Sequence, residues 1–160
     1  MGTALKTLVF TFVAPGTVTV LLPYFILTRT EPWSLGSIRY VGLPILCLGV
    51  AIYAWCAWSF TFKGRGTPAP IDPPKILVVE GLYRFVRNPM YVGVLTILAG
   101  EVIWFASPIL LVYAGCLAGL FHGFIRLYEE PKLLDLFGGQ YTAYRNEIPR
   151  WWPRFPRRNR

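Results

Sequence analysis

The chain carries three long apolar runs that are almost free of charge. The first extends from Thr7 to Thr28 and the second from Tyr40 to Phe62, and neither contains a charged residue. Each exceeds the roughly 20 residues that a helix needs to cross the hydrocarbon core of a membrane. The third run, from Met90 to Ile125, is interrupted only by Glu101 and is too long for a single crossing.

Ser107-Pro108 divides this third run into a helical hairpin. Serine is a favoured N-cap residue and proline is favoured at the first helical position, so the dipeptide predicts a new helix start. We therefore predict an all-α fold: a single integral membrane domain over residues 1–160, with four transmembrane helices and a C-terminal helical tail. The predicted spans lie at about 7–28, 40–62, 90–106 and 108–128.

The distribution of positive charge favours four spans. With four crossings, only Arg29 and Arg39 of the sixteen Lys and Arg residues fall on one side of the membrane. Because Lys and Arg accumulate on the cytoplasmic side, both termini and the tail are predicted to be cytoplasmic. The same side holds the polar segments 63–88 and 126–160, and the Gly/Pro-rich part of the first is predicted to be an irregular loop.

Composition narrows the class of protein. Apolar residues make up 54% of the chain and charged residues only 15%, whereas a soluble domain carries about 25% charged residues. These values exclude a disordered chain, a coiled coil and almost every soluble enzyme. The net charge of +8 suits an anionic membrane surface better than nucleic acid. We predict a multi-pass protein in contact with membrane lipids, in the plasma (inner) membrane if the source is bacterial, with no nucleic-acid partner. The three cysteines lack metal-ligand spacing, so no metal is expected.

Polar residues that could carry chemistry gather at the predicted cytoplasmic ends of the helices. In the segment 81–93, Arg84 and Arg87 precede Asn88-Pro89, which is predicted to be a helix cap and first helical residue. Either these two arginines belong to a functional site, or they anchor the helix end to lipid phosphates. In the tail, Tyr141 and Tyr144 are spaced to share a helical face.

A second cluster, at the end of the fourth predicted helix, consists of His122, Arg126, Glu129 and Glu130. Their spacing places them on one helical face. Adjacent carboxylates at the C-terminal end of a helix oppose the helix dipole. We therefore expect either pairing with Arg84, Arg87 or Arg126, or contact with a ligand.

The register of the hairpin places two further groups. With the turn near Ser107, His122 lies opposite about Val92, level with the segment 81–93. Glu101 lies opposite about Tyr113, deeper in the bilayer, where an ionisable side chain is a candidate functional residue. We predict a protonated Glu101 that is hydrogen-bonded to Tyr113.

The runs GLYRFVRNPMYVG at 81–93 and LYEEPKLLDLFGGQYTAYRNEIPRWWP at 127–153 resemble the isoprenylcysteine carboxyl methyltransferase / phospholipid methyltransferase superfamily of membrane enzymes. That family joins a G-x-Y-R-x-x-R-H-P-x-Y-x-G motif to an E-E-x-x-L…F-G-x-x-Y-x-x-Y…P-R-W-x-P motif. The two motifs occur here in the family's order, with a helical hairpin between them. The resemblance covers residues 81–153 and implies S-adenosylmethionine as the methyl donor, bound on the cytoplasmic side.

The resemblance also assigns residues to the cofactor site. The first motif, which helps to hold the cofactor, falls on Tyr83, Arg87, Asn88, Pro89, Tyr91 and Gly93. The second motif, which closes over it, falls on Glu129, Glu130, Tyr141, Tyr144, Arg150 and Trp151. The family's His-Pro is Asn88-Pro89 here, so this position lacks a titratable proton.

The methyl acceptor implied by the resemblance is lipophilic or membrane-associated. A carboxylate acceptor of the isoprenylcysteine type needs only an arginine to hold it, Arg150 or Arg126. A phospholipid amine must lose a proton, which would involve Glu129, Glu130 or His122. Arg150, Glu130 and His122 are the predicted catalytic residues. The alternative to an enzyme is a non-catalytic membrane protein of the same fold that binds lipid or a partner.

Overall fold

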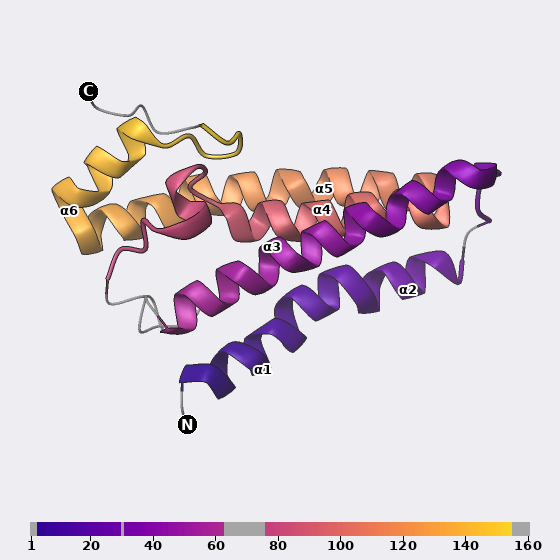
Figure 1. Ribbon diagram of the computed structural model, residues 1–160, viewed down its shortest axis with the longest axis horizontal. Helices are drawn as coiled ribbons and strands as arrows, with labels where there is room; N and C mark the ends of the chain where they lie inside the picture. Colours follow the sequence, from indigo (N-terminus) through magenta and orange to yellow (C-terminus); the bar gives the residue numbers. More distant parts are fainter. Residues whose placement is uncertain (1–2, 30, 63–75, 155–160) are drawn as a thin grey trace.

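A computed structural model describes residues 3–29, 31–62 and 76–154, and this part of the chain is helical with irregular connections and no strand (Figure 1). The predicted all-α class is confirmed for these residues. The Gly/Pro-rich segment at 63–75 and the basic end at 155–160 lie outside them. The elements in chain order are α1 (Thr3–Gly16), a π-helical turn η1 (Thr17–Leu21), α2 (Leu22–Leu27), a 3-10 helix η2 (Gly36–Val41), α3 (Gly42–Phe62), a 3-10 turn η3 (Gly81–Arg84), α4 (Pro89–Phe105), α5 (Pro108–Phe124), a second π-helical turn η4 (Ile125–Glu129) and α6 (Glu130–Glu147).

Three continuous helical runs are long and apolar enough to cross a membrane. They are Leu5–Leu27, Gly36–Phe62 and Pro108–Glu147, while the apolar helix Pro89–Phe105 is shorter. The run Pro108–Glu147 has 40 residues but is broken at Gly138, whose backbone angles are not helical. Even the part before this break is longer than a ~30 Å hydrocarbon core requires. We treat α5 as its membrane-spanning part. Four crossings remain a prediction. The first turn of α1 and the C-terminal tail lie at the same end of the bundle, as an even number of crossings requires (Figure 1).

The turn between α4 and α5 is as the sequence predicted. Ala106, which ends α4, has the left-handed backbone angle φ of 51° that reverses the chain. Ser107 is the N-cap of α5, and its side-chain oxygen accepts a hydrogen bond from the backbone N–H of Leu110 at 3.3 Å. Pro108 occupies the first helical turn, where its missing N–H costs nothing.

Glycines bring the backbones of the antiparallel helices α3 and α4 into direct contact. A Cβ added to Gly100 would lie 2.5 Å from the backbone nitrogen of Leu46, and one added to Gly49 would lie 2.5 Å from that of Ile97. The corresponding distances are 2.5 Å for Gly42, to the carbonyl oxygen of Gly100, and 2.9 Å for Gly93, to the backbone nitrogen of Tyr53. Within a membrane, small residues at an interface allow this close van der Waals packing, because lipid tails supply no hydrophobic force between helices. Helix α4 is thereby fixed to α3.

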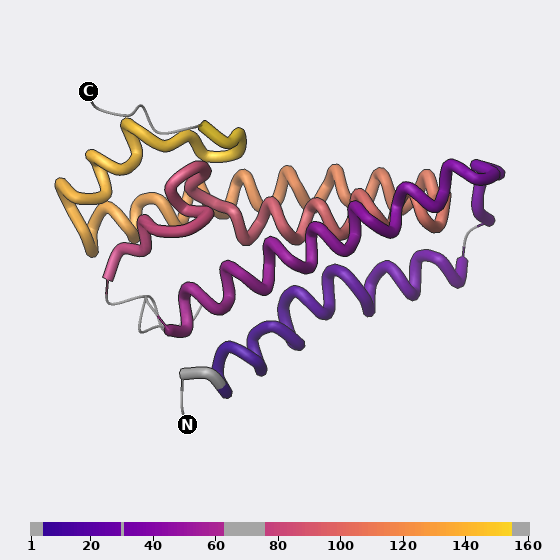
Figure 2. Tube along the Cα trace, viewed as in Figure 1, coloured from indigo at the N-terminus to yellow at the C-terminus, as the bar shows by residue number. Residues whose placement is uncertain are grey.

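The run α1–η1–α2 lies beside this pair, as the trace in Figure 2 shows, and polar side chains bond it to its neighbours. The hydroxyls of Thr11 and Tyr53 lie 2.9 Å apart, and Thr61 Oγ1 donates to Thr7 Oγ1 at 2.9 Å. On the other side, the Tyr113 hydroxyl donates to the carbonyl of Val18 in η1 at 2.8 Å.

The predicted hydrogen bond between Glu101 and Tyr113 is therefore wrong. The Tyr113 hydroxyl is directed to the carbonyl of Val18, which the π-helical turn presents to it. Glu101 is buried on α4, and within the described residues its Oε2 atom has no hydrogen-bond partner. In an α-helix the carbonyl of Val18 would accept from the N–H of Leu22, but the π-helical turn directs that N–H to the carbonyl of Thr17.

Candidate active site

The tail that follows α6 is bound to the segment before α4 by backbone hydrogen bonds. The N–H of Arg87 donates to the carbonyl of Pro149 at 2.9 Å, and the N–H of Arg154 donates to that of Phe85 at 2.8 Å. The side chain of Asn88 adds a donor from Nδ2 to the carbonyl of Arg150 at 3.3 Å. Asn88 precedes Pro89 at the start of α4 as predicted, but its side chain does not cap the helix. It joins the helix start to the tail.

Glu130 holds two arginines from distant parts of the chain. Arg150 donates from Nε and Nη2 to its two carboxylate oxygens at 2.7 and 2.8 Å, and Arg87 donates from Nη1 to Oε1 at 2.9 Å. The side chains of Glu130 and Arg87 are only 9% and 10% exposed. Burial alone would raise the pKa of the Glu130 carboxyl, but the hydrogen bond of Arg150 and the charges of Arg87 and Arg150 lower it on balance. Glu130 is therefore an ionised bridge between α6, the helix start and the tail.

This pairing differs in two ways from the expectation. Arg87 is one of the predicted partners, whereas the second arginine is Arg150 rather than Arg84 or Arg126. The helix also does not end at Glu130: it continues through η4 into α6 and is first broken at Gly138, where φ is 51° and ψ is −122°, and a second helical part of α6 then reaches Glu147. The carboxylates thus lie within a helical run, and the predicted conflict with a helix C-terminus does not arise.

Glu129, the neighbouring carboxylate, has different surroundings. It accepts a hydrogen bond from the hydroxyl of Tyr91 on α4. Burial is the main cause that raises the pKa of Glu129, the Tyr91 bond lowers it, and the charge of Glu130 raises it further. The two adjacent carboxyl groups therefore differ in pKa: Glu130 is held ionised by arginines, while Glu129 has a raised affinity for a proton.

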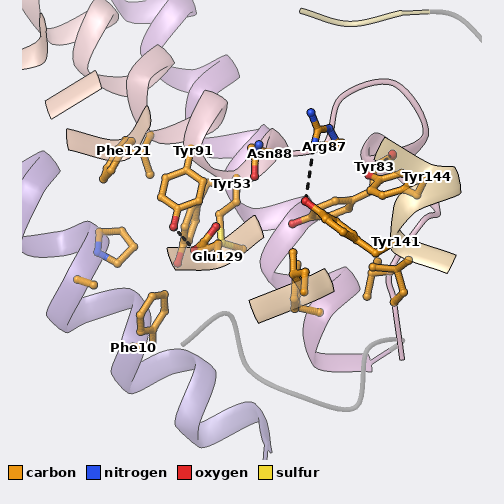
Figure 3. A pocket seen from close by; sticks show the side chains of 18 of the residues that line it. Phe10, Tyr53, Tyr83, Arg87, Asn88, Tyr91, Phe121, Glu129, Tyr141 and Tyr144 are labelled. Atoms are coloured by element: carbon orange, nitrogen blue, oxygen red, sulfur yellow. Dashed lines mark hydrogen bonds between the residues drawn. The ribbon is translucent and has the colours of Figure 1, made fainter. Parts of the chain in front are cut away.

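A cavity of about 200 Å³ lies between these groups and the N-terminal helices. Figure 3 shows Arg87, Tyr141 and Tyr144 at one end and Phe10, Phe121 and Tyr91 at the other, with Glu129 bonded to Tyr91. Aromatic side chains make up much of the wall: Phe10, Tyr53, Phe60, Tyr83, Tyr91, Phe121, Tyr141 and Tyr144. The cavity thus has charged groups at one end and an apolar wall that the spanning helices form.

The structure brings seven of the predicted cofactor residues to this cavity. They line it together: Tyr83, Arg87, Asn88, Tyr91, Glu129, Tyr141 and Tyr144. Four other predicted site residues do not line the cavity but hold the lining residues in place. Pro89 starts α4, Gly93 packs against the backbone of Tyr53, and Glu130 and Arg150 fix the position of Arg87.

His122 and Trp151 lie apart from the lining. The indole Nε1 of Trp151 donates to Nδ1 of His122 at 3.1 Å, and the two rings are nearly parallel, with centroids 6.2 Å apart. This contact fastens the tail to α5. The predicted position of His122, level with Val92, is close to what is observed, because the rings of Tyr91 and Phe121 are in contact.

Sequence reasoning missed the part of the cavity that the N-terminal half supplies. Phe10, Ala14, Pro15 and Val18 come from α1 and η1, and Tyr53 comes from α3. These residues lie outside the two motifs, and an aromatic residue within an apolar span carries no distinguishing pattern. A tyrosine hydroxyl inside a predicted span, as at Tyr53, was the single available signal.

Apolar helices of spanning length, together with a cavity that has charged groups at one end, indicate an integral membrane protein with a candidate binding site. The chain belongs to the phospholipid methyltransferase family, whose sequence profile matches residues 37–140. The match includes α3, the hairpin and the first part of α6, and it ends just before Tyr141. The family is, by its description, one of phospholipid methyltransferases.

Among curated proteins, the chain is similar to Protein-S-isoprenylcysteine O-methyltransferase B of Arabidopsis thaliana. The two are 33% identical over 73 residues, which make up 46% of this chain and 37% of that protein. The chain thus matches less than half of the length of this relative. No solved structure matches the chain.

Proposed function

We propose that the protein is an integral membrane methyltransferase that moves a methyl group from S-adenosylmethionine to a lipophilic or membrane-associated acceptor. The observation that carries this proposal is the cavity, which has charged groups at one end and an apolar wall from α1 and α3 along its side. A soluble cofactor and a lipid acceptor need these two environments, and methyl transfer needs both ligands aligned and shielded from water.

The residues at the charged end fit S-adenosylmethionine, which supplies an activated methyl group on a sulfonium. Aromatic faces such as those of Tyr141 and Tyr144 suit adenine and a cation. The buried Nε of Arg87 has no hydrogen-bond partner within the described residues. It is a donor suited to the cofactor carboxylate.

For the acceptor, the lining favours a phospholipid amine. Arg150 is paired with Glu130, and the remaining donor of Arg87 is assigned to the cofactor carboxylate, so neither guanidinium is left to hold an acceptor carboxylate. The carboxylate that lines the cavity is Glu129, and its raised pKa suits it to take the proton that an ammonium group must lose. A carboxylate of the isoprenylcysteine type is the second candidate, because the Arabidopsis relative carries that name.

Titration calorimetry tests the cofactor. We expect S-adenosylhomocysteine to bind the detergent-solubilised chain and nicotinamide dinucleotides not to bind. Glu130→Ala should weaken binding about tenfold or more, because it leaves the buried Arg87 without its partner. Asp135→Ala, which removes an exposed carboxylate from the same helix, is the matched control. A folded protein without affinity for S-adenosylhomocysteine would contradict the proposal and favour a non-catalytic membrane protein of the same fold.

Methyl transfer to defined acceptors tests the acceptor class. With labelled S-adenosylmethionine, we expect product from a phosphatidylethanolamine and none from a farnesylcysteine. Glu129→Gln should lower the rate about 100-fold at neutral pH, the usual scale for loss of a general base. It should affect S-adenosylhomocysteine affinity much less. If farnesylcysteine is methylated, and the Glu129→Gln variant methylates it at the rate of the unaltered protein, the acceptor is a carboxylate and not an amine.

A further inference from the structure

A second cavity lies at the opposite end of the helices from the tail. Its volume is about 430 Å³. It is formed where the chain passes from α2 through the connection to η2 and meets the end of α4, at the right-hand end of Figure 1. The residues that line it include Trp33, Leu35, Arg39, Trp104 and Phe105. None of the residues of the candidate active site takes part.

Arg39 places a positive charge in this cavity. Its guanidinium carbon lies 5.2 Å from the ring centroid of Trp104 and 5.9 Å from that of Tyr40, so the side chain is held by cation–π contacts. No carboxylate pairs with Arg39 in the part of the chain that the structure describes. The fixed guanidinium is thus open to an anion from outside the protein.

The walls around Arg39 are fixed and carry exposed apolar groups. The N–H of Trp33 donates to the carbonyl of Ala106 at 2.8 Å, which ties the connection after α2 to the α4–α5 turn. The side chains of Trp33 and Phe105, which line the cavity, are 65% and 39% exposed. Tryptophan and tyrosine at the ends of apolar helices are typical of the headgroup level of a membrane.

We propose that this cavity binds an anionic membrane phospholipid, with its phosphate on the Arg39 guanidinium and its acyl chains along the apolar side chains beside it. Charge complementarity at the Arg39 guanidinium favours an anionic ligand. A free phosphate would make no contact with the neighbouring apolar groups, whereas a lipid covers the charge and these groups together. The site is separate from the acceptor site, because it lies at the far end of the helices.

Native mass spectrometry of the full chain in detergent tests the proposal. We expect a one-to-one complex with phosphatidylglycerol and weaker binding of phosphatidylcholine. Arg39→Gln should lower the affinity for phosphatidylglycerol about tenfold, and Arg39→Lys, which keeps the charge but loses the planar stacking, by less. Arg29→Gln is the matched control, because Arg29 is exposed, lies at the same end of the helices and does not line the cavity.

Three results would overturn the proposal. The first is an equal loss of phosphatidylglycerol in Arg29→Gln and Arg39→Gln, which would indicate diffuse surface charge. The second is displacement of the lipid by millimolar inorganic phosphate, which would indicate a simple anion site. The third is loss of S-adenosylhomocysteine binding in Arg39→Gln, which would show that the two cavities are not separate.

Discussion

Helix α3 has two neighbours and is held to them by different means. Towards α4, glycines such as Gly49 and Gly100 allow backbone to touch backbone. Towards α1, hydroxyl groups of Thr11, Tyr53 and Thr61 form hydrogen bonds, while side chains such as Phe12, 76% exposed, face outward. Both helices are apolar, so hydrophobicity does not distinguish them. In lipid, close packing and polar contacts decide which helices associate firmly.

The charged end and the apolar wall of the candidate active site differ in the same way, in how firmly the helices that carry them are attached to α3. The charged end is built on α4, which the glycine contacts fix to α3, and on the tail that Glu130 holds in place. The apolar wall is supplied partly by α1, which a few hydroxyl bonds attach. A cofactor site gains from rigid support, because binding groups must be held in place. A lipid-facing wall can be displaced at lower cost.

The largest effect is expected from Gly100→Leu. The new side chain would meet the backbone of α3 at Gly42 and Leu46, which has no rotamer to adjust. Overpacking of a well-packed interface costs about 1–3 kcal/mol even when side chains can move, so we expect at least the upper value here. The thermal unfolding midpoint in detergent should fall, and S-adenosylhomocysteine binding should be lost with it, because α4 carries Tyr91.

Gly119→Leu is the matched control for this prediction. Gly119 lies on α5, and a Cβ added there meets nothing within 4 Å. This variant should unfold at the temperature of the unaltered protein. Equal midpoints for Gly100→Leu and Gly119→Leu would show that the glycine contacts do not hold α3 and α4 together.

The sequence predicted the features of the fold that depend on local chemistry. Ser107-Pro108 located the turn of the hairpin because a cap and a proline act within one helical turn. The glycine contacts were missed, although Gly42 and Gly49 on one helix and Gly93 and Gly100 on the other have the same spacing. Glycines in an apolar run have no partner in the sequence, and only the packing of two helices shows which of them are in contact.

The candidate site was predicted where the two motifs lie. Tyr83, Tyr91 and Glu129 do line the cavity, whereas the partner of Glu130 was only half predicted, because Arg150 comes from a tail whose folding back could not be read from spacing. The position of the helix end was also wrong. A π-helical turn keeps the helix continuous through Glu129, and it leaves no mark in a pattern of apolar positions.

The smallest effect is expected on the side of α1, from Thr61→Val. Valine has nearly the same shape as threonine but removes the hydroxyl that donates to Thr7 at 2.9 Å. Hydrogen bonds between helices in a membrane contribute about 0.6 kcal/mol on average, so the unfolding midpoint should fall slightly. Because α1 forms part of the apolar wall, the KM for a lipid acceptor should change more than the affinity for S-adenosylhomocysteine.

Thr96→Val provides the control for this last substitution. The Thr96 hydroxyl donates to the carbonyl of Val92 within α4 at 2.7 Å, so its removal breaks no bond between helices and should leave the KM unchanged. A loss of stability in Thr61→Val as large as that in Gly100→Leu would mean that α1 is held as firmly as α4. The contrast between a rigid charged end and a displaceable apolar wall would then be wrong, and lipid would have to reach the cavity without movement of α1.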